Sequence, residues 1–140
     1  MTTTVAQWLD KHPGHQLAVQ EDAAMEEILI LFNSYPDVQD IYVTDPQGCV
    51  VGHISKLRIA RIVLSEHSQT HSHRQLIEQV ASGNARELMG RHFPTARLKE
   101  ALDDVIHRQL EHQLHDMAVL DTEGRLVGTI SLTGLLQSLA

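Results

Sequence analysis

The sequence has one cysteine, no long apolar run and little at its start that would direct it out of the cell. Cys49 alone can form neither an internal disulfide nor a thiolate zinc cage, so histidines and carboxylates would have to hold any metal. No stretch approaches the roughly 20 uninterrupted apolar residues that a membrane-spanning helix needs. Residues 1–4 lack the basic and apolar regions of a secretory signal. We therefore expect a cytoplasmic protein that does not enter a membrane.

Positive charge and catalytic motifs are also scarce. Lys and Arg number 11 against 18 Asp and Glu, which gives a formal net charge of -7 with no basic stripe, so nucleic acid is not expected as a partner. Paired carboxylates, a phosphate-cradling glycine loop and a nucleophile elbow are missing, so we expect no enzymatic activity. What is present is a chain of 140 residues, 42% of them hydrophobic, which suffices for one domain or two very small ones.

The most informative feature is an internal repeat. The segment VTDPQGCVVGHIS at residues 43–55 returns as VLDTEGRLVGTIS at residues 119–131, at a spacing of 76 residues (119 minus 43). In each copy an apolar run leads into a polar turn that ends in Gly48 or Gly124, and a second apolar run follows. This pattern predicts a β-hairpin in which the glycine supplies a positive φ. One supersecondary unit is therefore used twice.

Helical periodicity flanks each hairpin. Ser55 and Ser131 are natural N-caps for the short helices expected after the hairpins, whose apolar residues are Leu57, Ala60 and Leu64, then Leu132, Leu135, Leu136 and Leu139. Longer amphipathic helices, capped by Asp22 and Thr95, are expected before the hairpins. Their apolar stripes are Met25, Ile28, Leu29 and Phe32, then Leu98, Leu102, Val105 and Ile106. These stripes align at 73 residues (98 minus 25), which gives the second copy three extra residues between helix and hairpin.

Short apolar pieces at residues 17–19 and 92–94 precede the long helices and are expected to be brief first strands, so that each copy is β-α-β-β-α. Residues 4–9 and 84–89 each have the pattern of a capped helical turn that introduces a copy.

These elements suggest a division of the chain into three parts. We expect a first repeat with its N-terminal helix at residues 1–65, a His-rich linker and connecting helix at 66–83, and a second repeat at 84–140.

The order of these motifs resembles tandem CBS (cystathionine β-synthase) domains, the pair often called a Bateman module. The resemblance rests on residues 87–89, 116–121 and 124–131 and on their first-copy counterparts, and it covers nearly the whole chain. It implies an α/β fold in which two β-α-β-β-α repeats pack through their sheets with pseudo-twofold symmetry, and a flat homodimer of two such chains. It also implies a non-catalytic regulatory module that binds an adenosyl ligand (AMP, ADP, ATP or S-adenosylmethionine) or another anionic metabolite between the repeats and signals to an effector protein.

The resemblance places a Ser or Thr, and three residues later an Asp, against the ligand. Ser55 and Ser131 match the hydroxyl position, but the acid position holds Arg58 in the first copy and Gly134 in the second. A helix start with unpaired N–H groups favours a phosphate or carboxylate. The two serines would equally serve as helix caps alone.

Lys56 and Arg58 are unusual in a first helical turn, because each opposes the helix dipole by roughly 0.3–1 kcal/mol unless an anion lies nearby. The alternative is that both extend into solvent or pair with acids such as Asp45. We predict one retained site at Ser55, Lys56 and Arg58.

Two further residues belong to the candidate ligand-binding set. Gly134 either lets a ligand or a neighbouring backbone approach closely or is merely tolerated. Tyr42 either fills the core or lines the cleft beside an adenine ring.

Ten histidines are present, and His67, His71 and His73 cluster in the expected linker. On a helix, His67 and His71 would share a face at i, i+4, a geometry that can chelate zinc, nickel or copper. Their Ser and Thr neighbours favour a solvated linker instead. Beside the ligand-binding hypothesis we therefore keep a ligand-independent dimerisation or protein-interaction module, which the missing acids favour, and a His-based metal sensor.

Overall fold

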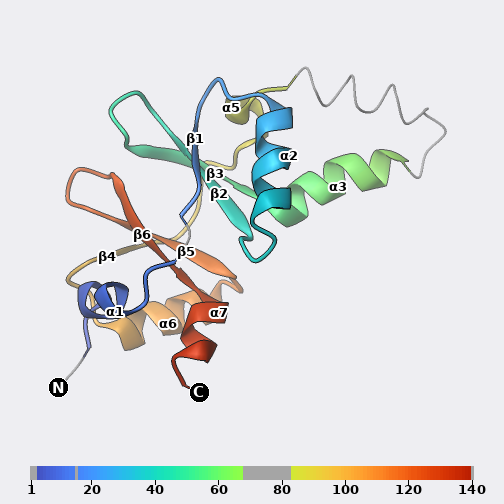
Figure 1. The fold of residues 1–140 in the computed structure, drawn as a ribbon. Coiled ribbons are helices and arrows are strands. Elements are labelled where there is room, and N and C mark those ends of the chain that lie inside the picture. The colour runs from blue at the N-terminus through green and yellow to red at the C-terminus, as the bar shows by residue number, and fades with distance from the viewer. Residues whose placement is uncertain (1–2, 15, 68–82, 140) are drawn as a thin grey trace.

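The computed structural model describes residues 3–14, 16–67 and 83–139 and contains two copies of one arrangement (Figure 1). The first copy consists of β1 (Ala18–Gln20), α2 (Met25–Ser34), β2 (Asp40–Thr44), β3 (Val50–Ser55) and α3 (Lys56–His67). The second consists of β4 (Thr95–Arg97), α6 (Leu102–Glu111), β5 (Asp116–Leu120), β6 (Leu126–Ser131) and α7 (Leu132–Gln137). Two short helices, α1 (Val5–Lys11) and α5 (Ala85–Leu88), precede the copies. The β-α-β-β-α order is confirmed for both.

Each copy forms a three-stranded sheet with the same topology and register. The first strand runs parallel to the second, and the second pairs antiparallel with the third. Val43 lies opposite Gly52, and Val119 opposite Gly128, with a register shift directly after each valine. The hairpin turns have positive φ at Gly48 (89°) and Gly124 (86°). The predicted hairpins are therefore confirmed.

The expected starts of the long helices are wrong. The N-caps of α2 and α6 are Ala24 and Ala101, neither of which makes a side-chain capping bond, and acidic residues in the first turn complement the helix dipole instead. Asp22 lies before α2, and Thr95 is the first residue of β4. The apolar segment at 92–94 precedes β4 rather than forming it.

The alignment of the two long helices also differs from the expected one. Ala24 and Ala101 are equivalent at 77 residues (101 minus 24) and Asp40 and Asp116 at 76, so the second copy has one residue fewer between helix and hairpin, not three more. Leu98 continued the helical periodicity upstream, but it lies in the turn between β4 and α6, where its carbonyl accepts the Ala6 N–H at 3.0 Å.

The buried face of α3 is not the one that its leucines suggested. Ile59 is buried, with Ile62 and Val63 packed beside it, whereas Leu57 and Leu64 are 60% and 63% exposed. In α7 Leu135 packs into the second core and Leu136 is exposed, and Leu139, which follows the helix, is exposed as well.

Each short leading helix packs against the opposite copy. The Val5 N–H of α1 bonds the Glu100 carbonyl at 2.9 Å, and the side chains of Val5 and Trp8 are buried in the second core. The Ala85 N–H of α5 bonds the Ala23 carbonyl at 2.9 Å, and Ala85 joins the first core. Figure 1 shows the same exchange, with α1 near α6 and α5 near α2.

The two copies meet along a pseudo-twofold axis, because equivalent residues contact one another across it. Cys49 forms an isolated antiparallel bridge with Arg125, which is its counterpart 76 residues on. Tyr42 and its counterpart Ala118 are buried together in a third core, with Leu120 and, packed against them, Phe93. Such self-pairing is what a twofold relation requires. The sheets therefore pack against each other, as expected.

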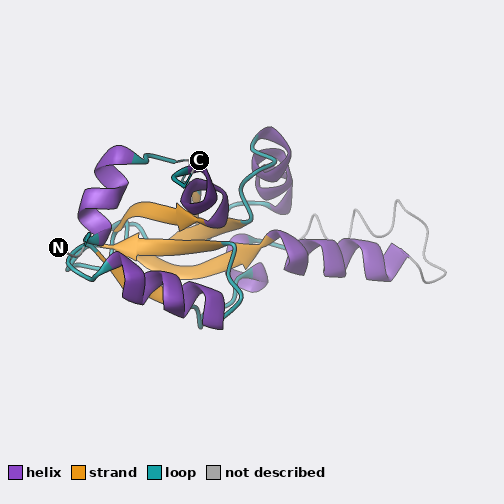
Figure 2. Cartoon of the chain, turned by 90° about the horizontal axis from the view of Figure 1, so that it is seen from below, coloured by secondary structure: helices purple, strands orange, loops and turns teal. Residues whose placement is uncertain are grey.

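Helices flank the strands on both sides, and α3 extends away from the rest of the molecule (Figure 2). Within the described residues, no helix combines the length and apolar character needed to traverse a bilayer.

Candidate functional site

Two hollows lie at equivalent places on the two copies. The first cleft, about 440 Å³, is lined by His53, Ser55, Leu57, Arg58, Arg61, Ile62 and Gly90. The second cleft, about 490 Å³, is lined by Trp8, Lys11, His12, Pro13, Gly14, Asp37, Val38, Asp116, Thr129, Ser131, Thr133, Gly134 and Gln137. Ser55 and Ser131 hold the same position in the repeat, so the clefts are related by the pseudo-twofold axis.

The second cleft is built from three separate parts of the chain. Its floor is the start of α7, where Ser131 caps the helix by accepting the Gly134 N–H at 2.9 Å. Asp37 and Val38 come from the loop between α2 and β2 of the first copy, and residues 11–14 follow α1. A molecule in this cleft would therefore touch both copies at once.

Trp8 occupies the space beside Gly134. A Cβ atom at Gly134 would lie 3.3 Å from Cη2 and 3.6 Å from Cζ2 of the indole, and 3.0 Å from the Ser131 hydroxyl. The indole stacks on the His12 ring at 4.8 Å between centroids. Any side chain at position 134 would therefore crowd the indole and the Ser131 hydroxyl.

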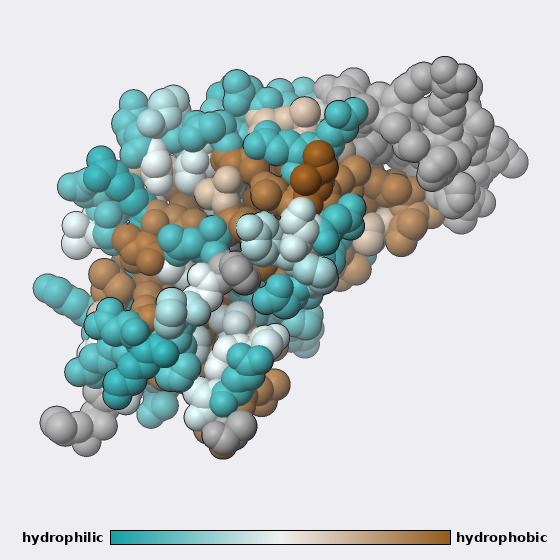
Figure 3. All heavy atoms as spheres, viewed as in Figure 1, coloured by the Kyte–Doolittle hydropathy of each residue, from teal (hydrophilic) through white to brown (hydrophobic). Residues whose placement is uncertain are grey.

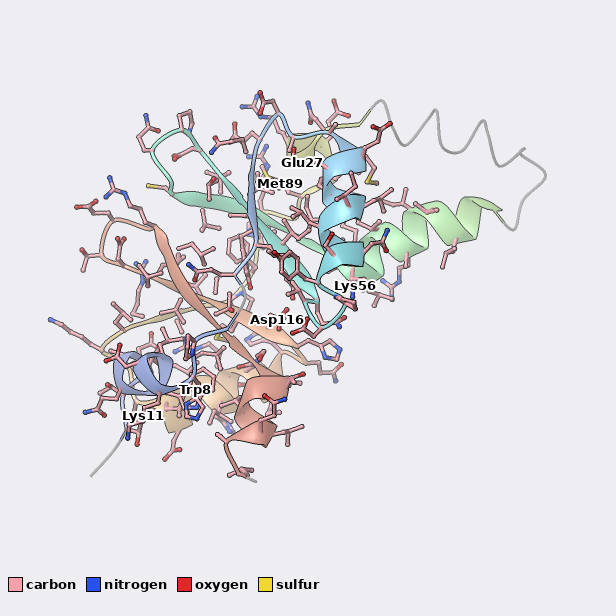
Figure 4. All side chains as sticks on the ribbon, in the orientation of Figure 1. Trp8, Lys11, Glu27, Lys56, Met89 and Asp116 are labelled. Carbon is pink, nitrogen blue, oxygen red and sulfur yellow. The ribbon has the colours of Figure 1, made fainter. Side chains whose placement is uncertain are left out.

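Asp116 is the most perturbed acid of the second cleft. Its side chain is at the start of β5, and its Oδ2 atom accepts the N–H groups of Gln39 at 2.8 Å and Asp40 at 3.1 Å from the opposite copy. Burial, with a further contribution from the negative charge of Asp40, raises the pKa of Asp116 to about 6. Figure 4 labels Asp116 together with Trp8 and Lys11 of the same cleft. Asp116 therefore joins the two copies and faces the cleft.

The residues that line the first cleft are held in place by hydrogen bonds with one another and with α5. The Arg58 Nε atom donates to the Leu88 carbonyl at 2.8 Å, which links α3 to α5. His53 and Gly90 exchange two backbone hydrogen bonds of 3.0 and 2.8 Å. Ser55 caps α3 by accepting the Arg58 N–H at 3.0 Å. A ligand here would have to compete with these contacts.

The predicted trio of Ser55, Lys56 and Arg58 is not brought together. Ser55 and Arg58 line the first cleft, but the Lys56 Nζ atom donates to the Pro36 carbonyl at 2.7 Å and lies 5.7 Å from the Phe32 ring centroid. The conflict of Lys56 with the helix dipole is thus resolved by a carbonyl and an aromatic face. Neither cation pairs with Asp45, whose carboxylate accepts N–H groups of its own turn.

The remaining predicted residues are divided between core and cleft. Tyr42 is 3% exposed in the core between the sheets and lines neither cleft. Ser131 and Gly134 both line the second cleft. His71, His73 and the side chain of His67 lie outside the described part of the chain. Among the residues that are described, no group of three or more His, Cys, Asp or Glu side chains is placed to hold a metal.

Sequence reasoning missed the residues that reach the second cleft from elsewhere. Trp8, Lys11 and Asp37 carry no local motif that points to a ligand. The nearest indication was the motif beginning at Asp116, which was recognised as part of the repeat but not as part of a site.

Comparisons with known proteins agree with this arrangement. A family model described as "CBS domain" matches residues 85–140. The CBS-domain containing protein ATU1752 from Agrobacterium tumefaciens has a TM-score of 0.77 at 17% identity, with 100% of this chain and 96% of that chain covered. A search of the curated proteins gives no match.

Two ligand complexes are also among the similar structures. One is the CBS domain pair of protein MJ0100 in complex with 5′-methylthioadenosine and S-adenosyl-L-methionine, with a TM-score of 0.74, 18% identity and coverage of 99% and 97%. The other is CBSX2 in complex with AMP, with a TM-score of 0.75, 20% identity and coverage of 97% and 95%. Residues 85–140 therefore match the CBS domain family, and the whole chain has the fold of a tandem CBS-domain pair.

Proposed function

We propose that this chain is a non-catalytic regulatory module that binds an adenosyl ligand in the second cleft and passes its occupancy on to a partner protein. The observation that carries the proposal is the composition of that cleft. The capped start of α7 supplies Ser131 and Gly134, and the opposite copy supplies Asp37 and Val38. Because the ligand would contact both copies, it would favour the mutual arrangement that fits it best. A partner that contacts both copies would then respond to the ligand.

The structural relatives support the class of ligand. Two similar CBS-pair structures are complexes with AMP or with 5′-methylthioadenosine and S-adenosyl-L-methionine. A third is the cytosolic domain of the Mg²⁺ channel MgtE in complex with ATP, of which this chain covers 44% at a TM-score of 0.65.

The test uses equivalent positions in the two clefts. Thr133 is exposed on the wall of the second cleft, and Leu57 is its counterpart in the first. We expect Thr133→Phe to fill the second cleft and to abolish binding of adenosine compounds in calorimetry, and Leu57→Phe to leave binding intact. Uptake of none of these compounds by the unaltered chain would contradict the proposal, and loss of binding with Leu57→Phe alone would assign the site to the first cleft.

A second function, homodimerisation, is favoured by apolar side chains exposed on the helices. Ile30 of α2 and Leu64 of α3 are each 63% exposed, and Leu136 of α7 is 69% exposed. Figure 3 shows hydrophobic residues gathered where α2 and α3 lie. Exposed apolar surface of this kind marks interaction sites. We propose that a second copy of the chain covers α2 and α3.

Light scattering tests the homodimer. We expect a dimer for the unaltered chain and a monomer for Ile30→Glu combined with Leu64→Glu, because a charge in an apolar interface loses its hydration without gaining a partner. Circular dichroism establishes that the double variant is folded. A monomeric unaltered chain would rule out the homodimer.

A further inference from the structure

The two clefts differ systematically in charge. Three basic or titratable side chains line the first cleft, and each has an uncharged residue at the position 76 residues on in the second. The pairs are His53 with Thr129, Arg58 with Gly134, and Arg61 with Gln137. The second cleft has therefore none of the cations that the repeat places in the first.

Of the two clefts, only the second is lined by carboxylates. Asp37 is exposed at its rim, and Asp116 is 8% exposed in its wall. The counterpart of Asp116 is Asp40, which lies 3.4 Å from the His53 ring and does not line the first cleft. The basic residues that line the cleft with Asp37 and Asp116 are Lys11 and His12, and His115 lies close enough to Asp116 to oppose the rise of its pKa. Two carboxylates thus share the cleft with one lysine.

The indole of Trp8 presents carbon atoms to the second cleft. Cη2 and Cζ2 are the ring atoms nearest the position of a Cβ atom at Gly134, at 3.3 and 3.6 Å. The Nε1 atom is buried without a hydrogen-bond partner among the described residues, so a ligand in the cleft would meet an apolar ring surface and not this donor. Such a surface gives a phosphate group no compensation for its lost hydration.

We propose that the second cleft selects nucleosides without phosphate groups, neutral or positively charged at the 5′ end, over nucleoside phosphates, and that Asp37 and Asp116 determine this specificity. The inference rests on the proposed function, because it names the ligand class of the same cleft. A phosphate placed here would lose hydration without meeting the arginines of the first cleft, and it would be repelled by the two acids. A sulfonium would be attracted by the same acids.

The experiment compares 5′-methylthioadenosine and S-adenosylmethionine with AMP and ATP by calorimetry at neutral pH and at low and high salt. Trp8, the only tryptophan, lines this cleft, so its fluorescence gives a second readout of binding. We expect both phosphate-free compounds to bind at least about tenfold more tightly than AMP at low salt, with a smaller difference at high salt.

Asp37→Asn tests the assignment of the specificity without altering the core, because Asp37 is exposed. We expect it to weaken S-adenosylmethionine binding and to strengthen AMP binding. The matched control is Asp104→Asn on α6, which removes an equal charge from an exposed position away from both clefts and should change neither affinity. Tighter binding of AMP or ATP than of the phosphate-free compounds, or an equal effect of the control, overturns the specificity and leaves the proposed function standing. Uptake of none of the four compounds overturns the proposed function itself.

Discussion

At the scale of single residues, the raised pKa of Asp116 predicts how stability changes with pH. Burial raises its pKa from 3.8 to about 6, so the folded chain holds this proton more tightly than the unfolded chain. The contribution of Asp116 to stability is therefore most favourable below pH 3.8, declines as the pH rises to about 6, and stays constant above that. Asp116→Asn removes the charge, and the amide oxygen can still accept the N–H groups of Gln39 and Asp40, since both now reach one oxygen.

We expect Asp116→Asn to raise the free energy of unfolding at neutral pH by about 1–3 kcal/mol and to change it little near pH 4. Urea unfolding at both pH values measures the difference. Asp104→Asn, on an exposed face of α6, should show no such pH-dependent gain. A destabilised Asp116→Asn at neutral pH would mean that the charge strengthens the contact between the copies.

Gln109 is a second residue whose role follows from its contacts. It is fully buried in α6, and its Nε2 atom donates to the carbonyls of His115 and Ile130 at 3.2 and 3.1 Å. We expect Gln109→Leu to lower the free energy of unfolding by about 1–3 kcal/mol, because two carbonyls lose their donor. Thermal unfolding measures it, and an unchanged midpoint would show that water replaces the amide. The control is Gln137→Leu, an exposed glutamine on α7.

At the scale of elements, β3 and β6 each contain a glycine, Gly52 and Gly128, at equivalent positions, and close contacts explain both. A Cβ atom at Gly52 would lie 2.9 Å from Cβ and 2.3 Å from the sulfur of Met89, whereas one at Gly128 would come closest to the two methyl groups of Leu9, at 2.8 and 3.1 Å. Met89 and Leu9 belong to the exchanged leading segments.

We expect Gly52→Ala to destabilise the fold by about 1–3 kcal/mol and Gly128→Ala by less, because a methyl group at a leucine tip moves more easily than a Cβ atom. Chemical denaturation of both variants measures the two losses, each being the control of the other. A larger loss for Gly128→Ala would contradict this account.

The elements were predictable where short-range chemistry decides them. Turn glycines, β-branched runs and the serines that cap α3 and α7 are local features, and the strands and hairpins follow from them. The limits of α6 were not predictable, because Leu98 extends the apolar periodicity by one turn before the helix begins. Lys56 was predicted in the site and Trp8 was not, because their partners, Pro36 and Gly134, are distant in sequence or belong to the other copy.

At the scale of the whole molecule, the exchange of α1 and α5 makes the copies dependent on each other. The second core contains Val5 and Trp8, which lie far outside the segment 85–140 that matches the CBS domain model. No local pattern in the sequence could have shown this, because each leading helix is amphipathic whichever sheet it covers.

We expect a fragment of residues 84–140 to lack a cooperative unfolding transition, because its core is missing two buried side chains. Circular dichroism during urea titration tests this, and addition of a peptide of residues 3–14 should restore the transition. A peptide with Val5 and Trp8 both replaced by Ser is the control. Cooperative unfolding of the fragment alone would show that α1 is dispensable.

The same exchange bears on how such a chain could arise by gene duplication. In a protein with only one repeat, no leading helix of the same chain would cover the sheet in this way. Two molecules would have to exchange their leading helices, and the protein would exist as a domain-swapped dimer. Joining two copies of the gene end to end would convert that intermolecular contact into an intramolecular one. Each half would then be free to diverge. The two halves of this chain have done so, because basic side chains line the first cleft and carboxylates line the second.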